Sequence, residues 1–259
     1  MKRSLLASAT ILALSGAAQA TMFGPDAFGY VGQDSEGPGA ISFNYQSIVP
    51  GGTLVAMGDD VSSLSSVNFA PVTLAVPFTF YGETVTSLVP SVNGYLTTDI
   101  DGDFGTEDLT PDWPLPQKPS APTDGKRIYA LHDDLEGSVY YAYDDMAIHP
   151  TLGSVGASIF QWEASYVEGE GPFSFQVLLF NNGDILMQFL GGDPGSPNGQ
   201  TATTGILNNG MFDVGLGING GNNDPFADDY AVLITQVPAP GAMGVLGVTG
   251  LAATRRRRR

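Results

Sequence analysis

The densest group of chemistry-bearing side chains in the sequence is a set of five carboxylates within ten residues. These are Asp99, Asp101, Asp103, Glu107 and Asp108. Carboxylates at alternate positions of a glycine-bearing loop let several oxygens converge on a hard cation such as Ca²⁺. The loop is not an EF-hand, because Phe104 and Thr110 stand where that motif needs Gly and Glu. We predict a Ca²⁺ site here, and a solvated acidic turn is the alternative.

Smaller acidic groups raise the same question more weakly. They are Asp133-Asp134, Asp144-Asp145, and Asp224 with Asp228-Asp229. An enzyme would use such groups differently, since glycosidases place two carboxylates about 5 to 10 Å apart. Asp134 and Glu163 are one such pair, although nothing in their spacing distinguishes them from the other acidic residues. A secreted hydrolase that uses paired carboxylates therefore remains an alternative function.

Other catalytic chemistries have few residues to draw on. The chain has no cysteine, so a thiol nucleophile is impossible, and its two histidines, His132 and His149, are too few for a histidine-rich zinc site. A serine nucleophile would need one of these histidines as its base, and no Gly-x-Ser-x-Gly turn accompanies them. Each motif has a sufficient role in folding, so we expect a protein that is not an enzyme.

The elements that would position these residues read as short strands. Gly (34 residues) and Pro (18 residues) are abundant, and no convincing amphipathic helical window interrupts the body. Runs rich in β-branched and aromatic residues alternate with turn residues, which predicts an all-β, antiparallel sandwich. The predicted strands are 41–48, 53–56, 72–76, 78–81, 84–89, 94–97, 128–131, 139–143, 158–163, 173–180, 185–190, 203–207, 212–218 and 230–235.

The clearest element is a hairpin. Strands 173–180 and 185–190 flank Asn181-Asn182-Gly183-Asp184, and the Asn-Gly pair predicts a tight type I′ turn. Apolar side chains lie on both faces of both strands near the turn. We therefore expect the hairpin in the centre of its sheet.

Several motifs along the body follow one order. They are Phe23-Gly24-Pro25-Asp26, Val76-Pro77-Phe78-Thr79-Phe80-Tyr81-Gly82, Ser91-Val92-Asn93-Gly94-Tyr95-Leu96, Asp133-Asp134, Val139-Tyr140-Tyr141, Phe160-Gln161-Trp162-Glu163, and Phe175-Gln176-Val177 with Asn182-Gly183-Asp184-Ile185. This order resembles the nidogen-like extracellular domain of bacterial secreted proteins. The resemblance implies a non-catalytic β-sandwich module of surface and matrix proteins. Val92 and His132 depart from the family's usual residues at their positions.

The two ends of the chain predict export. Met1-Lys2-Arg3, the apolar run Leu5 to Leu14, and Ala18-Gln19-Ala20 form the three parts of a secretory signal peptide. We expect signal peptidase to recognise Ala18 and Ala20, which makes residues 1–20 a signal helix and residues 21–236 the exported domain.

The C-terminal segment, residues 237–259, has three parts in order. Val237-Pro238-Ala239-Pro240 precedes the short apolar run Gly241 to Thr254, and five arginines follow. This layout resembles the PEP-CTERM sorting signal of bacterial exported proteins, in a VPAP variant. The resemblance implies processing by exosortase near Val237, Pro238 and Pro240. As a helix the apolar run spans roughly 21 Å, short of a bilayer's hydrocarbon core of about 30 Å, so we predict a transient or weak membrane anchor.

Charge limits the partners of the exported domain. Seven of the ten Lys and Arg lie in the terminal segments, which leaves three basic residues against 27 acidic ones, a formal charge of −24. Such a surface repels nucleic acid and anionic lipid. We expect a secreted or cell-surface structural or adhesion protein that associates with extracellular polysaccharide or matrix, with a small-ligand binding module as a further alternative.

Overall fold

The computed structural model describes residues 22–64, 70–99, 125–167, 171–190, 202–208, 214–219 and 229–237. Every regular element among them is a β-strand, and every neighbouring pair of strands is antiparallel. The predicted all-β antiparallel class is confirmed. The predicted signal helix and C-terminal apolar helix lie outside the described residues.

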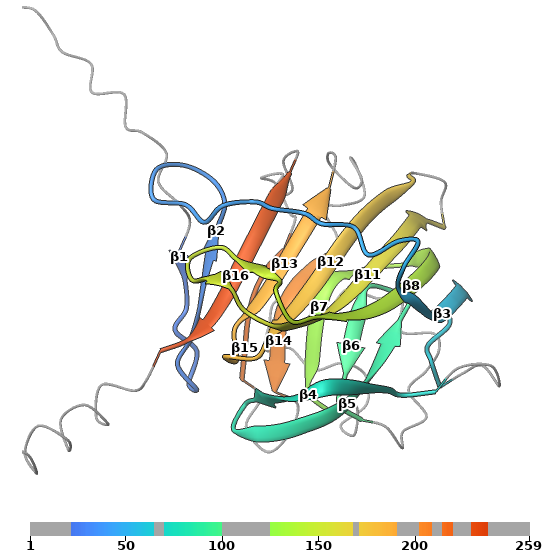
Figure 1. Ribbon diagram of the computed structural model, residues 1–259, viewed down its shortest axis with the longest axis horizontal. Helices are drawn as coiled ribbons and strands as arrows, with labels where there is room; N and C mark the ends of the chain where they lie inside the picture. The colour runs from blue at the N-terminus through green and yellow to red at the C-terminus, as the bar shows by residue number, and fades with distance from the viewer. Residues whose placement is uncertain are drawn as a thin grey trace, which may run out of the picture.

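Two sheets and one small hairpin make up the described fold (Figure 1). The larger sheet has the order β1 (Met22–Phe23), β2 (Tyr30–Asp34), β16 (Tyr230–Gln236), β13 (Ile185–Leu190), β12 (Phe173–Phe180), β11 (Ala157–Tyr166), β8 (Leu135–Asp144) and β3 (Thr53–Asp59). The smaller sheet has the order β15 (Val214–Asn219), β14 (Thr203–Asn208), β7 (Arg127–His132), β6 (Tyr95–Thr97), β5 (Glu83–Ser91) and β4 (Val72–Phe80). The hairpin consists of β9 (Ile148–His149) and β10 (Gly153–Ser154).

The two sheets share one hydrophobic core, which is the packing of a sandwich. Alternate residues of strands in both sheets, such as Phe160 and Trp162 on β11 and Ile128 and Ala130 on β7, point into it, as the period of a strand requires. Trp162 on β11 stacks on Phe175 of β12, with ring centroids 5.0 Å apart. Its indole Nε1 donates a 2.8 Å hydrogen bond to the carbonyl oxygen of Ser91 at the end of β5. This buried bond ties the inner faces of the two sheets together and satisfies the polar atom of the indole.

The outer face of the larger sheet is covered by the segment between β2 and β3, residues 35–52, which we call the strap. In Figure 1 it is the blue segment that crosses in front of the sheet. Ile41, Phe43 and Ile48 of the strap pack with outward-facing side chains such as Leu178 and Leu186 in a second hydrophobic cluster. The larger sheet is therefore buried on both faces over its central strands.

A row of glutamines holds the strap in place. Gln161, Gln176 and Gln188 lie side by side on β11, β12 and β13, each at most 1% exposed. The bonds to the strap run from the Ile48 amide to Gln161 Oε1 (2.8 Å), from Gln176 Nε2 to the Gln46 carbonyl (2.8 Å), and from the Asn44 amide to Gln188 Oε1 (2.9 Å). Gln176 Nε2 also donates to Gln161 Oε1 at 2.7 Å.

The prediction of a strand over residues 41–48 is therefore wrong. The apolar residues of that segment do alternate toward the sheet, but it pairs with no strand. The amides of Asn44 and Ile48 and the carbonyl of Gln46 bond to glutamine side chains instead. Several other predicted strands are confirmed with small changes of boundary. The two runs 72–76 and 78–81 form one edge strand, β4, whose register shifts between Thr73 and Phe78, around Pro77.

The hairpin of β12 and β13 lies in the middle of the larger sheet, as predicted. Its turn differs from the prediction. Of the Asn-Gly pair only Gly183 has a positive φ, 97°, and Phe180 pairs with Asp184 across a three-residue loop. This is the type I turn followed by a left-handed glycine, because a type I′ turn needs positive φ at both central residues.

Candidate functional site

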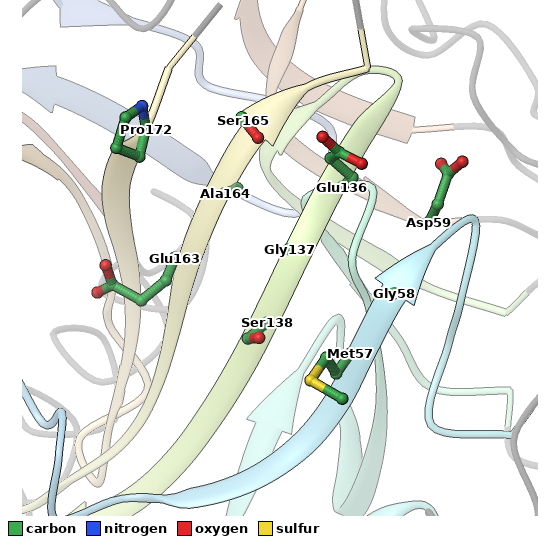
Figure 2. A pocket seen from close by; sticks show the side chains of 10 residues that line it. All are labelled: Met57, Gly58, Asp59, Glu136, Gly137, Ser138, Glu163, Ala164, Ser165 and Pro172. Carbon is green, nitrogen blue, oxygen red and sulfur yellow. The ribbon is translucent and has the colours of Figure 1, made fainter. Parts of the chain in front are cut away.

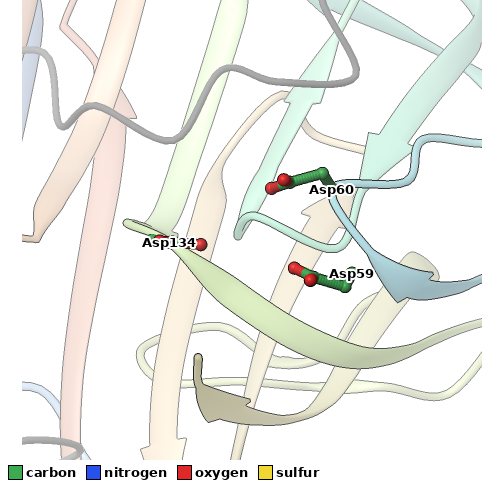
Figure 3. A group of neighbouring side chains, drawn as sticks. All are labelled: Asp59, Asp60 and Asp134. Carbon is green, nitrogen blue, oxygen red and sulfur yellow. The ribbon is translucent and has the colours of Figure 1, made fainter. Parts of the chain in front are cut away.

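Three aspartates converge where β3 ends and β8 begins (Figure 3). Asp59 is the last residue of β3, Asp60 follows it, and Asp134 lies in the turn between β7 and β8. One carboxylate oxygen from each lies within 4.8 Å of the others. The antiparallel pairing of β3 with β8 brings these segments together although more than seventy residues separate them in the sequence.

Asn93 fixes the loop that carries Asp60. Its side chain is fully buried, with Nδ2 donating to Asp60 Oδ1 at 3.1 Å and Oδ1 accepting from the Leu135 amide at 3.0 Å. Asp60 has φ 54°, a left-handed conformation that aspartate tolerates better than most residues. Asn93 thus connects the β5–β6 turn to both segments of the aspartate group.

This arrangement has the chemistry of a hard-cation site. Carboxylate oxygens are the ligands that Ca²⁺ prefers, and three of them supply part of the six to eight that it takes. Asp60 and Asp134 are half-buried and Asp59 is exposed, so solvent can reach the group. A divalent cation at this position would relieve the repulsion among three neighbouring negative charges.

A hollow of about 550 Å³ opens beside this group, on the outer face of the larger sheet (Figure 2). Its lining comes from β3, β8, β11 and the residue before β12: Met57, Gly58, Asp59, Glu136, Gly137, Ser138, Glu163, Ala164, Ser165 and Pro172. Asp59 belongs both to the hollow and to the aspartate group. Carboxylates and hydroxyls dominate the polar side of the lining.

Glu163 is the most firmly held carboxylate of the hollow. Its Oε2 accepts a 2.7 Å hydrogen bond from Ser174 Oγ, and its Oε1 accepts from Gln161 Nε2. Burial raises the pKa of the Tyr45 phenol in the strap well above its usual value, and the negative charge of Glu163 raises it further. Glu163 therefore marks the border between the strap and the open hollow.

The residues predicted from sequence fall in several places. Asp99 follows β6, where its amide donates to Thr97 Oγ1 at 3.2 Å, and it is separate from the three converging aspartates. Asp101, Asp103, Glu107 and Asp108 lie outside the described residues, so the predicted Ca²⁺ loop stays a prediction. Ala18, Ala20, Pro238 and Pro240 also lie outside them. The Val237 amide donates to the Gly29 carbonyl at 2.8 Å.

The structure does not place Asp134 and Glu163, the catalytic pair considered from sequence, opposite each other on neighbouring strands. The Val167 amide donates to the Asp134 carbonyl, so Asp134 lies opposite Val167, while Glu163 is four residues earlier on β11. At about 3.4 Å per residue the two backbone positions are roughly 14 Å apart. Asp59 and Glu136, which sequence reasoning did not single out, are direct cross-strand neighbours instead.

The two histidines occupy different surroundings. His132 is fully buried against Tyr129 and Tyr95, with ring centroids 5.2 and 5.1 Å apart. His149 Nε2 lies 3.1 Å from Asp184 Oδ2, and its Nδ1 lies 3.2 Å from both the amide nitrogen and Oγ1 of Thr151. The amide of Thr151 donates to Nδ1, so these contacts attach the β9–β10 turn to the β12–β13 hairpin.

None of the described residues forms a helix long and apolar enough to cross a membrane. No curated protein and no solved structure matches the chain. One family model does match: the model described as NIDO related covers residues 38–242, which takes in most of the strap, every strand from β3 to β16 and the aspartate group. Because the match spans well over half of the sequence, the chain belongs to the NIDO-related family.

Proposed function

We propose that this chain is a non-catalytic structural or adhesion module that is exported and works at the cell surface or in the extracellular matrix, in association with polysaccharide. The observation that carries the proposal is the NIDO-related match over residues 38–242, which is consistent with an extracellular structural module. The acidic hollow and the aspartate group lie together at one corner of the sandwich and share Asp59.

The packing of polar side chains supports a structural role. The buried glutamines of the larger sheet bind the strap, and buried Asn93 binds the two loops around Asp60. These groups already have partners within the fold, so they stabilise it and leave the exposed carboxylates of the corner available for binding.

Export and surface delivery are tested by deleting Gly241 to Arg259 and comparing cell-bound with released protein. We expect release into the medium with an unchanged melting temperature, because the deleted segment follows the last strand, β16, which ends at Gln236. If the shortened chain stays cell-bound to the same extent, attachment resides in the folded domain.

The non-catalytic role is tested by a glycan array run beside a panel of glycosidase substrates. Glycan binding without turnover supports the proposal. Turnover that disappears in Glu136→Gln would instead establish a hydrolase and overturn it, because Glu136 faces Asp59 across β3 and β8 at the cross-strand spacing of about 5 Å.

A further inference from the structure

The outer face of the larger sheet is only partly covered. The strap runs along the glutamine row, and the next outward residues on β11, β8 and β3 are Glu163, Ser138 and Met57, which lie opposite one another. One step further lie Ser165, Glu136 and Asp59, again in register. These two open rows line the hollow of about 550 Å³ (Figure 2).

The open rows are negatively charged without any basic neighbour among the described residues. The basic residues of that part of the chain are Lys126, whose Nζ lies 2.6 Å from Glu83 Oε2, and Arg127, whose guanidinium lies 4.6 Å above the Tyr95 ring. Arg127 is the first residue of β7 in the smaller sheet, and Lys126 directly precedes it. Asp59 and Glu136 are exposed, so their charges point into solvent at the hollow.

The strap shows how this face holds an extended chain. Its backbone lies across the strands, where the amides of Asn44 and Ile48 and the carbonyl of Gln46 bond to side chains that point out of the sheet. The two open rows offer the same kind of surface one step further along the strands, with hydroxyls at Ser138 and Ser165 and with carboxylates in place of the amides.

From this geometry we infer that the hollow binds an extended peptide segment of a partner protein, one that carries lysine or arginine side chains. Directly opposed residues on adjacent strands have Cβ atoms about 5 Å apart, so one ammonium group can reach both Asp59 and Glu136. Met57, 55% exposed, lies beside them and can pack against the aliphatic stem of the same side chain. The inference rests on the proposed extracellular function and adds to it a protein partner besides the polysaccharide named there.

The test uses the full chain and a fluorescent peptide in which lysine alternates with threonine, with binding measured by anisotropy at low ionic strength. Glu136→Lys should weaken binding about tenfold, equivalent to 1.4 kcal/mol. Asp145→Lys is the matched control, since Asp145 is also an exposed acidic residue, just beyond the far end of β8 from the hollow, and its reversal changes the net charge equally. The control should weaken binding by less than about twofold.

A second measurement locates the peptide directly. In a chain labelled at the methionine methyl groups, the Met57 signal should shift on titration while that of Met146, 61% exposed on another part of the surface, should not. Equal weakening by the two charge reversals, or an unshifted Met57 signal, overturns the inference. So does binding of a glucosamine oligomer at this site when the peptide does not bind. Cell-surface delivery and glycan binding are separate measurements, so failure here leaves the proposed function intact.

Discussion

Individual side chains decide how the strap is held, and the sequence pattern of the strap does not reveal it. Residues 41–48 alternate like a strand because Ile41, Phe43 and Ile48 do pack on the sheet. Three of their backbone groups, at Asn44, Gln46 and Ile48, bond to the side chains of Gln188, Gln176 and Gln161, which come from three strands of the sheet. Alternation reports which side of a segment is buried, but it cannot report whether a backbone or a side chain receives its hydrogen bonds.

Removing one side chain of the glutamine row should destabilise the whole fold. We expect Gln176→Ala to lower the free energy of unfolding by about 1–3 kcal/mol, because the buried Gln161 Oε1 and the Gln46 carbonyl both lose the Gln176 Nε2 donor. Gln33→Ala is the control, since Gln33 donates to the Gly39 carbonyl at 2.7 Å in an exposed place, and its loss should cost less than about 0.5 kcal/mol. Equilibrium urea unfolding measures both, and equal losses would contradict this account.

At the scale of elements, hydrophobic pattern and turn residues predict most of the strands but not every turn. The central hairpin forms where its two apolar faces indicate, yet the positive-φ pair of a type I′ turn occurs at Tyr81-Gly82, between β4 and β5, with φ 48° and 77°. Tyr81 accepts this conformation while its ring packs against Tyr30 and Phe80. Tertiary packing, which has no signature in a short run of sequence, outweighs the local preference for Asn or Gly.

The left-handed glycine of the central hairpin provides a clean test of backbone strain. A Cβ at Gly183 would meet no atom within 4 Å, so Gly183→Ala should destabilise only through its φ of 97°, by about 1 kcal/mol. Gly51→Ala in the strap is the control, because Gly51 has no positive φ and its added Cβ would lie 3.7 Å from the Ile48 carbonyl oxygen. We expect that variant to unfold at the same or a higher temperature than the parent. A neutral Gly183→Ala would show that the hairpin turn relaxes freely.

For the whole molecule, the candidate site depends on contacts that sequence reasoning cannot supply without a register. The sequence indicates Asp133-Asp134 as an acidic pair but gives no sign that Asp59 and Asp60 are its neighbours, because these come from the far end of β3 and meet it only through the β3–β8 ladder. One sequence pattern could have indicated this site, namely an Asp-Asp pair at the end of a strand, which occurs at Asp59-Asp60 as well as at Asp133-Asp134. The acidic loop that begins at Asp99 can be recognised from sequence because its members lie close together in the chain. Their spacing alone does not give the geometry in which they would meet a cation.

Calcium should stabilise the molecule through one of these two acidic groups. Residues 21–236 carry a formal charge of −24, so closely spaced carboxylates repel in the folded state and a bound divalent ion relieves that repulsion. The stabilisation should reach about 2.7 kcal/mol when free Ca²⁺ is roughly 100 times its dissociation constant. We therefore expect the melting temperature to rise more with millimolar CaCl₂ than with NaCl of matched ionic strength.

Two variants assign the calcium effect to a position. If the loop binds the ion, Asp101→Ala with Asp103→Ala should abolish the excess shift, whereas Asp60→Asn with Asp134→Asn should leave it. The opposite result would place the ion at the aspartate group. There Asn93 Nδ2 already donates to Asp60 Oδ1 at 3.1 Å, and Asp134 comes from a different loop than Asp59 and Asp60. Equal shifts from the two salts would show that general screening of the negative charge, which is sensitive to ionic strength alone, accounts for the stabilisation.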